Sequence, residues 1–151
     1  MLPILRIVVD QQGELTMRVL FWYCEHFEWV PAMRTLDDAP AAESAAHEAV
    51  VAAFVHVEPG DVDAGSSSET KLVKNAKWLA RKWRVTDIIL HSFTHLAEDK
   101  AAPETARFLL NRAQERLKAA GYRAYQTPYG YFLDLSIKAP GHPLARVFKA
   151  F

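Results

Sequence analysis

Apolar residues along this chain occur in two kinds of pattern. Short runs rich in β-branched and aromatic side chains predict strands, because such side chains pack well on a pleated sheet. Three runs lie in the first part of the sequence, at residues 4–9, 17–29 and 50–57. Three more lie at residues 86–90, 122–126 and 131–137.

Two longer stretches show the three- and four-residue spacing of amphipathic helices. The first opens at Ser66-x-x-Glu69, which has the spacing of a capping box, and continues to about residue 84. The second begins at Pro103, a favoured first-turn residue, and stops at Gly121. The predicted buried faces are Leu72, Val73, Ala76, Leu79, Ala80 and Trp83 in the first, and Ala106, Leu109, Leu110, Ala113 and Leu117 in the second.

Strands alternating with two helices predict an α/β fold with a mixed β-sheet packed against two main amphipathic helices. Residues 122–137 are expected to form a hairpin, and a short helix is expected after Gly141-His142-Pro143. Residues 17–151 are predicted to be a single domain. Residues 1–16 form an N-terminal extension, either an extra strand or a segment upstream of a native start at Met17.

The composition narrows the class of protein. The chain has 151 residues, of which 50% are hydrophobic and 24% charged, as expected of one globular domain. No apolar run approaches the about 20 residues of a membrane helix, and the N-terminus lacks a basic region and a cleavage site. The only cysteine is Cys24. We therefore expect a cytoplasmic protein without a membrane partner, a disulfide or a cysteine-rich zinc site.

The formal net charge is zero, but the two kinds of charge are separated along the chain. Residues 1–69 hold three Lys or Arg and twelve Asp or Glu, a net charge of −9, whereas residues 70–151 hold fifteen and six, a net charge of +9. One face of the first predicted helix carries only cations: Lys71, Lys74, Lys77, Arg81, Lys82 and Arg84. Such a face suits nucleic-acid phosphates, although it also suits pairing with the acidic half of the chain.

The densest group of candidate functional residues is His91-Ser-Phe-Thr-His95, directly after a predicted strand. Ligands in open α/β sheets bind beyond the carboxyl ends of strands, so His95 above all is placed for a functional role. The alternative is that one histidine packs in the core and the other is solvated. No third ligand is evident, so no metal site is expected.

Two other groups have a functional and a structural interpretation. Cys24 and His26 would share a face of a strand as a nucleophile and base, although a buried structural cysteine is commoner. Pro128-Tyr-Gly-Tyr131 could contact a base through its aromatic rings and through close backbone approach at Gly130. The alternative there is a plain hairpin turn.

Five groups of residues, taken in order, resemble one known family. They are Met17-Arg-Val-Leu20 with Glu28, Phe93-x-His95-Leu96, Leu110-Asn111-Arg112, Pro128-x-Gly130-Tyr131 and Gly141-His142-Pro143-Leu144-Ala145. Together they resemble the N-terminal editing domain of archaeal threonyl-tRNA synthetases, which is related in fold to D-aminoacyl-tRNA deacylases.

The resemblance implies hydrolysis of the ester in mischarged aminoacyl-tRNA without a cofactor. It implies His95 as the catalytic residue, with the acceptor end of tRNA bound by Phe93, Thr94, Pro128, Tyr129, Gly130, Tyr131, Phe132, Leu133, His142 and Arg146. Lys71, Lys74, Lys77 and Arg81 are expected to contact RNA. No ligase domain follows, so a free-standing version is expected, with a second copy of the chain and a threonyl-tRNA synthetase as candidate partners.

This chain departs from the family at polar positions. The family typically has tyrosine and lysine lining the seryl pocket where Phe132 and Leu133 stand, glutamate where Arg146 stands, and aspartate where Glu25 stands. Two hypotheses follow. Either the site hydrolyses or binds another aminoacyl-like ligand, larger or less polar than the seryl group, or catalysis is lost and the chain binds tRNA or a synthetase. A small-ligand domain without RNA contact is a third, weaker alternative.

Overall fold

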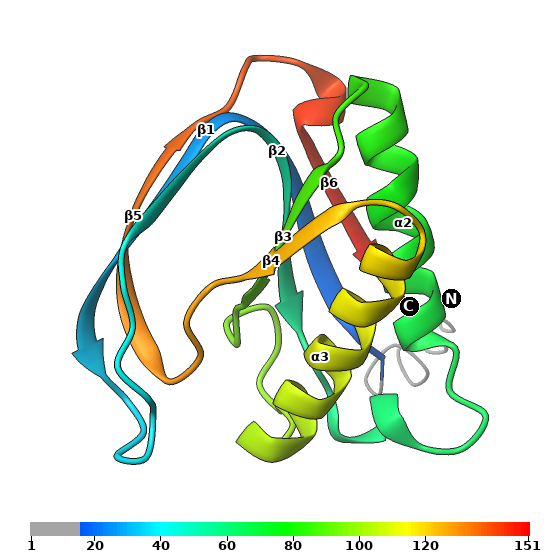
Figure 1. Ribbon diagram of the computed structural model, residues 1–151. Coiled ribbons are helices and arrows are strands. Elements are labelled where there is room, and N and C mark those ends of the chain that lie inside the picture. Colours follow the sequence, from blue (N-terminus) through cyan, green and yellow to red (C-terminus); the bar gives the residue numbers. More distant parts are fainter. Residues whose placement is uncertain (1–15) are drawn as a thin grey trace, which may run out of the picture.

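The computed structural model describes residues 16–151, so the strand expected at residues 4–9 and nearly all of the N-terminal extension lie outside the described part. Six strands, two α-helices and two short 3-10 helices follow one another in this range (Figure 1). In chain order they are β1 (Arg18–Arg34), β2 (Ala45–His56), η1 (Pro59–Val62), α2 (Ser68–Trp83), β3 (Asp87–Ser92), α3 (Pro103–Ala119), β4 (Arg123–Gln126), β5 (Tyr131–Lys138), η2 (Pro143–Ala145) and β6 (Arg146–Ala150).

The strands form one mixed sheet in the order β4-β3-β2-β1-β5, with β6 also paired to β1. β2, β3 and β4 run parallel to one another, whereas β1 is antiparallel to all its neighbours. Along its second edge β1 pairs first with β6, over Arg18–Trp22, and then with β5, over His26–Arg34. β1 is long enough to serve two partners because it has 17 residues.

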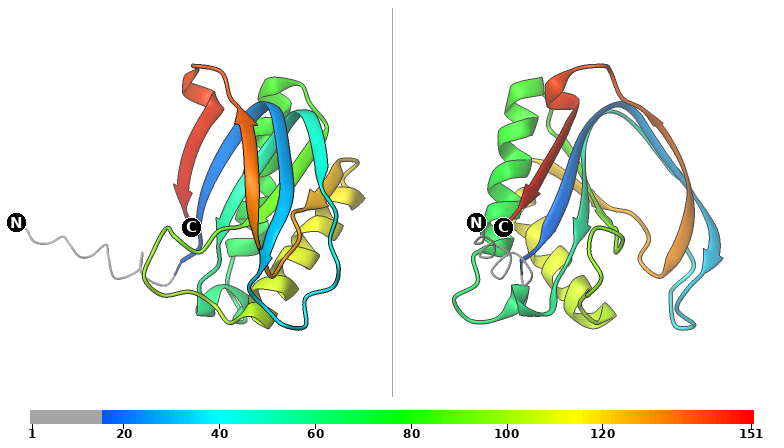
Figure 2. Two further views of the ribbon diagram at one scale, coloured as in Figure 1. Left: turned by 90° about the vertical axis from the view of Figure 1, so that its left-hand side faces the viewer. Right: turned by 180° about the vertical axis from the view of Figure 1, so that it is seen from behind.

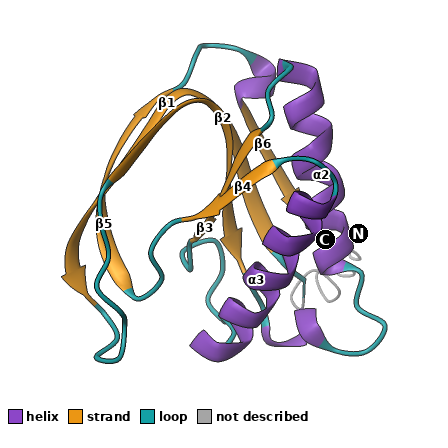
Figure 3. Ribbon diagram, in the orientation of Figure 1, coloured by secondary structure: helices purple, strands orange, loops and turns teal. Residues whose placement is uncertain are grey.

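The sheet is strongly curled. Figures 1 and 2 show β1 and β2 rising together and bending over into an arch, with β5 on the far limb. Ala49, in the outer part of β2, has a left-handed φ of 55°. Both α-helices lie on one side of the central strands, and the hollow of the arch lies on the other (Figure 3).

Hydrophobic side chains occupy both faces of this curled sheet. The helices pack on one face through a cluster that includes Phe21, Leu72 and Leu109. A second cluster, including Phe27, Phe54 and Ile89, occupies the other face, where Leu133 and Leu135 of β5 pack against it. Because strand side chains alternate between the two faces, β3 contributes Leu90 to the first cluster and Ile89 to the second.

The predicted buried faces of both helices are confirmed, but the predicted N-terminal cap of α2 is not. All the predicted apolar residues of both helices are buried, except Trp83, which is partly buried. The prediction of a capping box at Ser66-x-x-Glu69 is wrong. The N-cap residue is Ser67, and its side chain makes no cap hydrogen bond. Glu69 turns away instead and pairs with Arg112 and Arg116 of α3, at 3.0 and 2.8 Å.

Two expectations for the C-terminal third are also wrong. β4 and β5 do not form a hairpin, because they lie at opposite ends of the sheet order and residues 127–130 cross between them. The expected last helix is a single 3-10 turn, η2, and it leads into a strand, β6, that the sequence analysis missed. Both differences arise from the length of β1, which provides the edge on which β5 and β6 pair.

Candidate functional site

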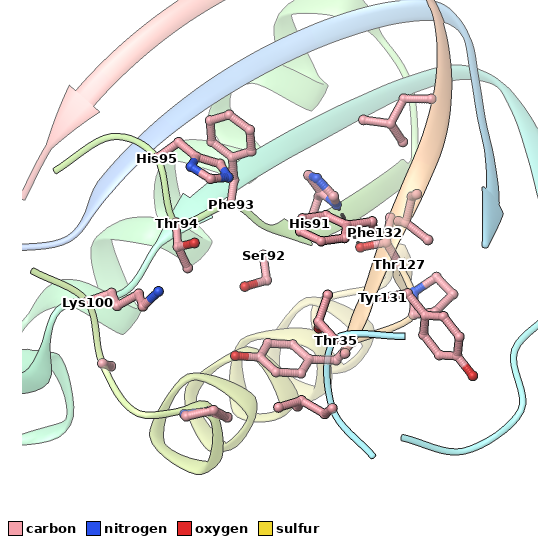
Figure 4. A pocket seen from close by; sticks show the side chains of 18 residues that line it. Thr35, His91, Ser92, Phe93, Thr94, His95, Lys100, Thr127, Tyr131 and Phe132 are labelled. Atoms are coloured by element: carbon pink, nitrogen blue, oxygen red, sulfur yellow. Dashed lines mark hydrogen bonds between the residues drawn. The ribbon is translucent and has the colours of Figure 1, made fainter. Parts of the chain in front are cut away.

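A cavity of about 510 Å³ opens where β3 and β4 end, beside the start of α3 and the start of β5 (Figure 4). Its walls come from four separate parts of the chain. They are Thr35, Leu36, His91, Ser92, Phe93, Thr94, His95, Lys100, Ala101, Pro103, Thr127, Pro128, Tyr129, Gly130, Tyr131, Phe132, Leu133 and Leu135. The carboxyl ends of parallel strands are where ligands bind in α/β sheets, and this cavity occupies that place.

Most of the residues predicted for the site meet here. Phe93, Thr94 and His95 form one wall, and residues 128–133 form another. Figure 4 shows His95, Thr94 and Lys100 on one side of the cavity, with Thr127, Tyr131 and Thr35 on the opposite side. Residues that lie more than 30 positions apart in the sequence therefore face the same space.

Two predicted site residues lie elsewhere. Arg146 begins β6 and stacks its guanidinium over the ring of Trp22, 5.6 Å from the centroid. His142 caps η2 by accepting a hydrogen bond from the Leu144 N–H and packs edge-on against Trp83, 5.1 Å between centroids. Neither lines the cavity. The position after Gly-His-Pro-Leu-Ala lies on β6, which pairs with the first part of β1, away from β5.

The predicted RNA-binding face is also separate from the cavity. None of the described cavity-lining residues belongs to α2. Lys71, Lys74 and Arg81 are exposed and Lys77 is partly exposed. Among residues 16–151 none of these four cations takes part in an ion pair. The expected alternative, pairing of this face with the acidic half of the chain, is therefore not realised in the part of the chain that the structure describes.

His91 is a cavity residue that was noticed in the sequence but not chosen for the site. Its Nδ1 lies 2.8 Å from the Thr127 hydroxyl, and its ring packs edge-on against Phe54, 4.7 Å between centroids. Burial lowers the pKa of His91 to about 4, so the ring is neutral at neutral pH. No described residue bonds its Nε2. Alternation along β3 identifies this position, since Ile89 and His91 point to the same face.

His95 lies at the more open side of the cavity. Its side chain is exposed, and its ring meets the edge of Phe93 at 5.0 Å between centroids. Lys100 is exposed on the same side. The arrangement gives the mouth of the cavity a hydrogen-bonding imidazole and an ammonium group, while aromatic rings lie further in.

Tyr129 connects the crossing segment to the opposite wall. Burial raises the pKa of its hydroxyl, and this is partly offset by a hydrogen bond with Ser92 and by the charge of Arg107. The Arg107 guanidinium also lies over the Tyr129 ring, 5.4 Å from the centroid. Tyr129 is therefore tied both to β3 and to α3.

Gly130 is placed by close backbone packing. Its φ is +88°, and a Cβ atom there would lie 2.9 Å from the Cβ of Ala39. Its carbonyl accepts a hydrogen bond from the Thr35 N–H at 2.7 Å. This contact brings residues 35 and 36 to the cavity, and the close approach at Gly130 is to residues 36 and 39 of the chain itself.

Few charged side chains line the cavity. The described lining residues include no Asp, Glu or Cys, and Lys100 is the single Lys or Arg among them. No group of three or more potential metal ligands occurs within residues 16–151. Cys24 is buried on the other side of β1 from His26, which contacts Glu28 and Glu48, and burial raises the pKa of the Cys24 thiol to about 12. These two side chains do not form a nucleophile and base pair.

The family model for the archaea-specific editing domain of threonyl-tRNA synthetase matches residues 17–151. The chain belongs to this family. A threonine–tRNA ligase of Pyrobaculum calidifontis is 35% identical over 141 residues, and one of Thermofilum pendens is 29% identical over 136. The matches cover 89% and 87% of this chain but 22% of each ligase, so the chain spans about a fifth of these relatives.

Solved structures confirm the fold of this editing-domain family member. A probable eukaryotic D-amino acid tRNA deacylase has a TM-score of 0.57 at 10% identity, over 90% of this chain and 98% of that one. A c-Myc DNA unwinding element binding protein has a TM-score of 0.62, also at 10% identity, over 87% and 97%. The predicted α/β class and the deacylase-like fold are therefore correct. Within residues 16–151 no helix is both long enough and apolar enough to cross a bilayer.

The four positions at which this chain departs from the family pattern do not all lie in the cavity. Leu133 and Phe132 line the cavity, and Phe132 is 61% exposed. Glu25 is exposed and pairs with Lys138 at 3.5 Å, outside the cavity. Arg146 is outside as well. Of these four departures, Phe132 and Leu133 of β5 are the two that line the cavity.

Proposed function

We propose that this protein edits mischarged aminoacyl-tRNA by hydrolysing the ester at the 3′ end of the tRNA. One observation carries the proposal. Two of the segments that match the family, residues 93–95 and 128–131, lie far apart in the sequence and form facing walls of one cavity at the carboxyl end of parallel strands. Editing by a separate site is needed where binding alone separates similar amino acids poorly.

The reaction requires little of the protein. A water oxygen attacks the ester carbonyl carbon, the carbonyl oxygen takes up negative charge, and the bond to the ribose oxygen breaks to release a free amino acid and tRNA. His95 at the mouth is placed to orient the water or the substrate. The Lys100 ammonium lines the same cavity and would stabilise the developing negative charge. This chemistry suits a cavity without a cysteine or a carboxylate.

The walls favour an aminoacyl group whose side chain is uncharged and largely apolar. Leu133 and Leu135 of β5 face Phe93 and the neutral ring of His91. No acidic side chain among the described lining residues is available to pair with a cationic side chain of the aminoacyl group. We therefore expect the substrate to carry a less polar side chain than serine, with Leu133 in contact with it.

Deacylation of a panel of aminoacyl-tRNAs tests the proposal. The panel contains seryl, aliphatic, aromatic and charged aminoacyl esters on the same tRNA, and release of the amino acid is measured over time. Faster hydrolysis than the uncatalysed rate is expected for an apolar ester, with a loss of about 100-fold in His95→Ala. His26→Ala is a matched control, because His26 contacts Glu28 and Glu48 outside the cavity.

A substitution at Leu133 tests the proposed substrate specificity separately from catalysis. Leu133→Asn adds a polar group to the wall and keeps the branched shape of the side chain, so hydrolysis of the apolar ester should fall more than that of seryl-tRNA. Background rates for every ester would contradict the catalytic proposal. A preference for serine would contradict only the proposed specificity.

The basic face of α2 supports a second candidate, a tRNA- or synthetase-binding module without catalysis. Its cations are unpaired within residues 16–151 and are remote from the cavity lining. This candidate predicts salt-dependent RNA binding in the absence of hydrolysis of any ester. Binding through α2 together with hydrolysis would combine the two functions.

A further inference from the structure

One wall of the cavity is an irregular loop, residues 93–101, between β3 and α3. Five of its residues line the cavity: Phe93, Thr94, His95, Lys100 and Ala101. The loop includes His95, and it has no regular secondary structure to fix its position. The groups that hold it therefore determine where the His95 ring lies.

The end of β2 holds both ends of this loop through backbone hydrogen bonds. The Phe93 N–H donates to the Val55 carbonyl at 3.0 Å, and the Ala101 N–H donates to the Val57 carbonyl at 2.8 Å. The middle of the loop, residues 94–100, makes no backbone–backbone hydrogen bond within residues 16–151. It is held instead by the side chain between these two carbonyls, that of His56.

His56 contacts the loop with both ring nitrogens. Its Nδ1 accepts a hydrogen bond from the Leu96 N–H at 3.3 Å, directly after His95, and its Nε2 donates to the Asp99 carbonyl at 2.6 Å. The side chain is fully buried. An acceptor at Nδ1 and a donor at Nε2 require the neutral ring with its proton on Nε2.

A network of buried polar side chains also contacts the His56 ring and limits its rotation. Glu58 Oε2 lies 3.2 Å from His56 Nε2 and accepts a hydrogen bond from Arg18 at 2.8 Å. Asp61 in turn accepts from the Glu58 N–H at 2.7 Å and from the Ser68 hydroxyl at 2.7 Å. The network thus connects the cavity loop to the start of α2. Such a network orients a side chain because each member limits the rotation of the next.

We infer that His56 is a positioning residue for the cavity: it fixes residues 95–99, and through them His95 and Lys100, without touching the substrate. The inference rests on the proposed function for its catalytic consequence and on geometry for the rest. His56 lies outside the cavity-lining set, so its effect must pass through the loop. A shift of about 1 Å in a reacting group is enough to lower a rate by about 100-fold.

Half-isosteres of histidine separate the two bonds. His56→Asn keeps an acceptor near the position of Nδ1 for the Leu96 N–H, and His56→Gln keeps a donor near the position of Nε2 for the Asp99 carbonyl. His56→Phe keeps the ring volume and loses both bonds. We expect kcat on the best ester to fall by about 100-fold in His56→Phe and by about tenfold in each of the other two. KM should change less than threefold, because the remaining walls are intact.

Loss of global stability has to be separated from loss of position. Leu72→Ala is the matched control, because Leu72 is a fully buried residue of α2 outside the cavity and its truncation destabilises the protein. At a temperature where all variants are folded, Leu72→Ala should keep the wild-type kcat. Native-state hydrogen exchange supplies a second readout. The Leu96 amide should exchange at least tenfold faster in His56→Phe and close to the wild-type rate in His56→Asn.

The outcomes are distinct. Wild-type kcat and wild-type Leu96 exchange in His56→Phe would overturn the inference. An equal loss of kcat in Leu72→Ala would also overturn it, because stability alone would then explain the effect. If the wild-type protein hydrolyses no ester, the proposed function fails, while faster Leu96 exchange in His56→Phe still supports the anchoring role of His56.

Discussion

His91 Nδ1 and Thr127 Oγ1 lie 2.8 Å apart and connect the carboxyl ends of two neighbouring parallel strands inside the cavity. The pair makes the His91 ring part of a neutral wall. Its burial has a consequence for stability that can be measured without a substrate.

We expect His91 to make the folded state less stable in mild acid. Its pKa is about 4 in the folded state and 6.5 for the unperturbed group, so the unfolded chain binds the proton first as the pH falls. Above about pH 6.5 the neutral ring costs no stability. As the pH falls from about 6.5 to 4, protonation of this histidine in the unfolded chain lowers the free energy of unfolding by about 3 kcal/mol. Chemical denaturation of wild type and His91→Phe from pH 7 to pH 4 measures it.

The variant should show a shallower dependence of the unfolding free energy on pH than the wild type. Thr127→Val is the control for the hydrogen bond, because it removes the partner and leaves the titrating ring in place. Its slope should remain close to that of the wild type. Equal slopes for wild type and His91→Phe would contradict the prediction.

Substitution of glycine by alanine should depend on position. Gly130→Ala combines a left-handed φ of +88° with a contact of 2.9 Å to the Ala39 Cβ, so it should cost about 1–3 kcal/mol or more. Gly121→Ala has a φ of +95° and open space, so it should cost less. Gly141→Ala has neither problem and should be close to neutral. Denaturant midpoints of the three variants check the order, which would be wrong if Gly141→Ala were the most destabilised.

The basic face of α2 should dominate any RNA affinity. The triple charge reversal Lys74→Glu, Lys77→Glu and Arg81→Glu should weaken tRNA binding and lower the slope of log K against log salt by about three. The control Lys118→Glu, Lys138→Glu and Lys149→Glu changes the net charge equally but on other elements. A titration at several salt concentrations measures both, and equal losses would show that only net charge matters.

Cys24 should be chemically inert in the folded protein. It is fully buried, and burial raises the pKa of the thiol to about 12, so almost no thiolate is present at neutral pH. A thiol reagent such as DTNB should react slowly in buffer and rapidly in guanidinium chloride. Fast reaction in buffer would show that the second hydrophobic cluster opens locally.

Patterns within one element predicted the fold well, and relations between elements did not follow from them. The buried face of α2 follows from spacing alone, because a helix repeats every 3.6 residues whatever it packs against. The pairing of β5 with β1 does not follow, since residues 127–130 look like a short turn and turn length alone favours a hairpin. The missed β6 has five residues, mostly exposed, with no alternating pattern to mark it.

The candidate site shows the same division. Position after a strand already indicates His95, and the aromatic and glycine residues indicate Pro128–Tyr131, whereas Phe132 and Leu133 were predicted only through the family resemblance, which carries information about spatial neighbours that one sequence lacks. Arg146 was included because it directly follows a motif, yet its place on β6 puts it over Trp22. His91 and His56 become functional candidates only once the face on which each ring lies is known.

The crossing of residues 127–130 from one edge of the sheet to the other determines when the cavity is completed during synthesis. By residue 126 the chain already contains both α-helices and the strands β1 to β4. The wall formed by Tyr131, Leu133 and Leu135 is still missing at that point. Domains generally fold as units. A chain ending at residue 126 would contain most of the residues of the first hydrophobic cluster but would lack one wall of the cavity, which residues 127–151 supply.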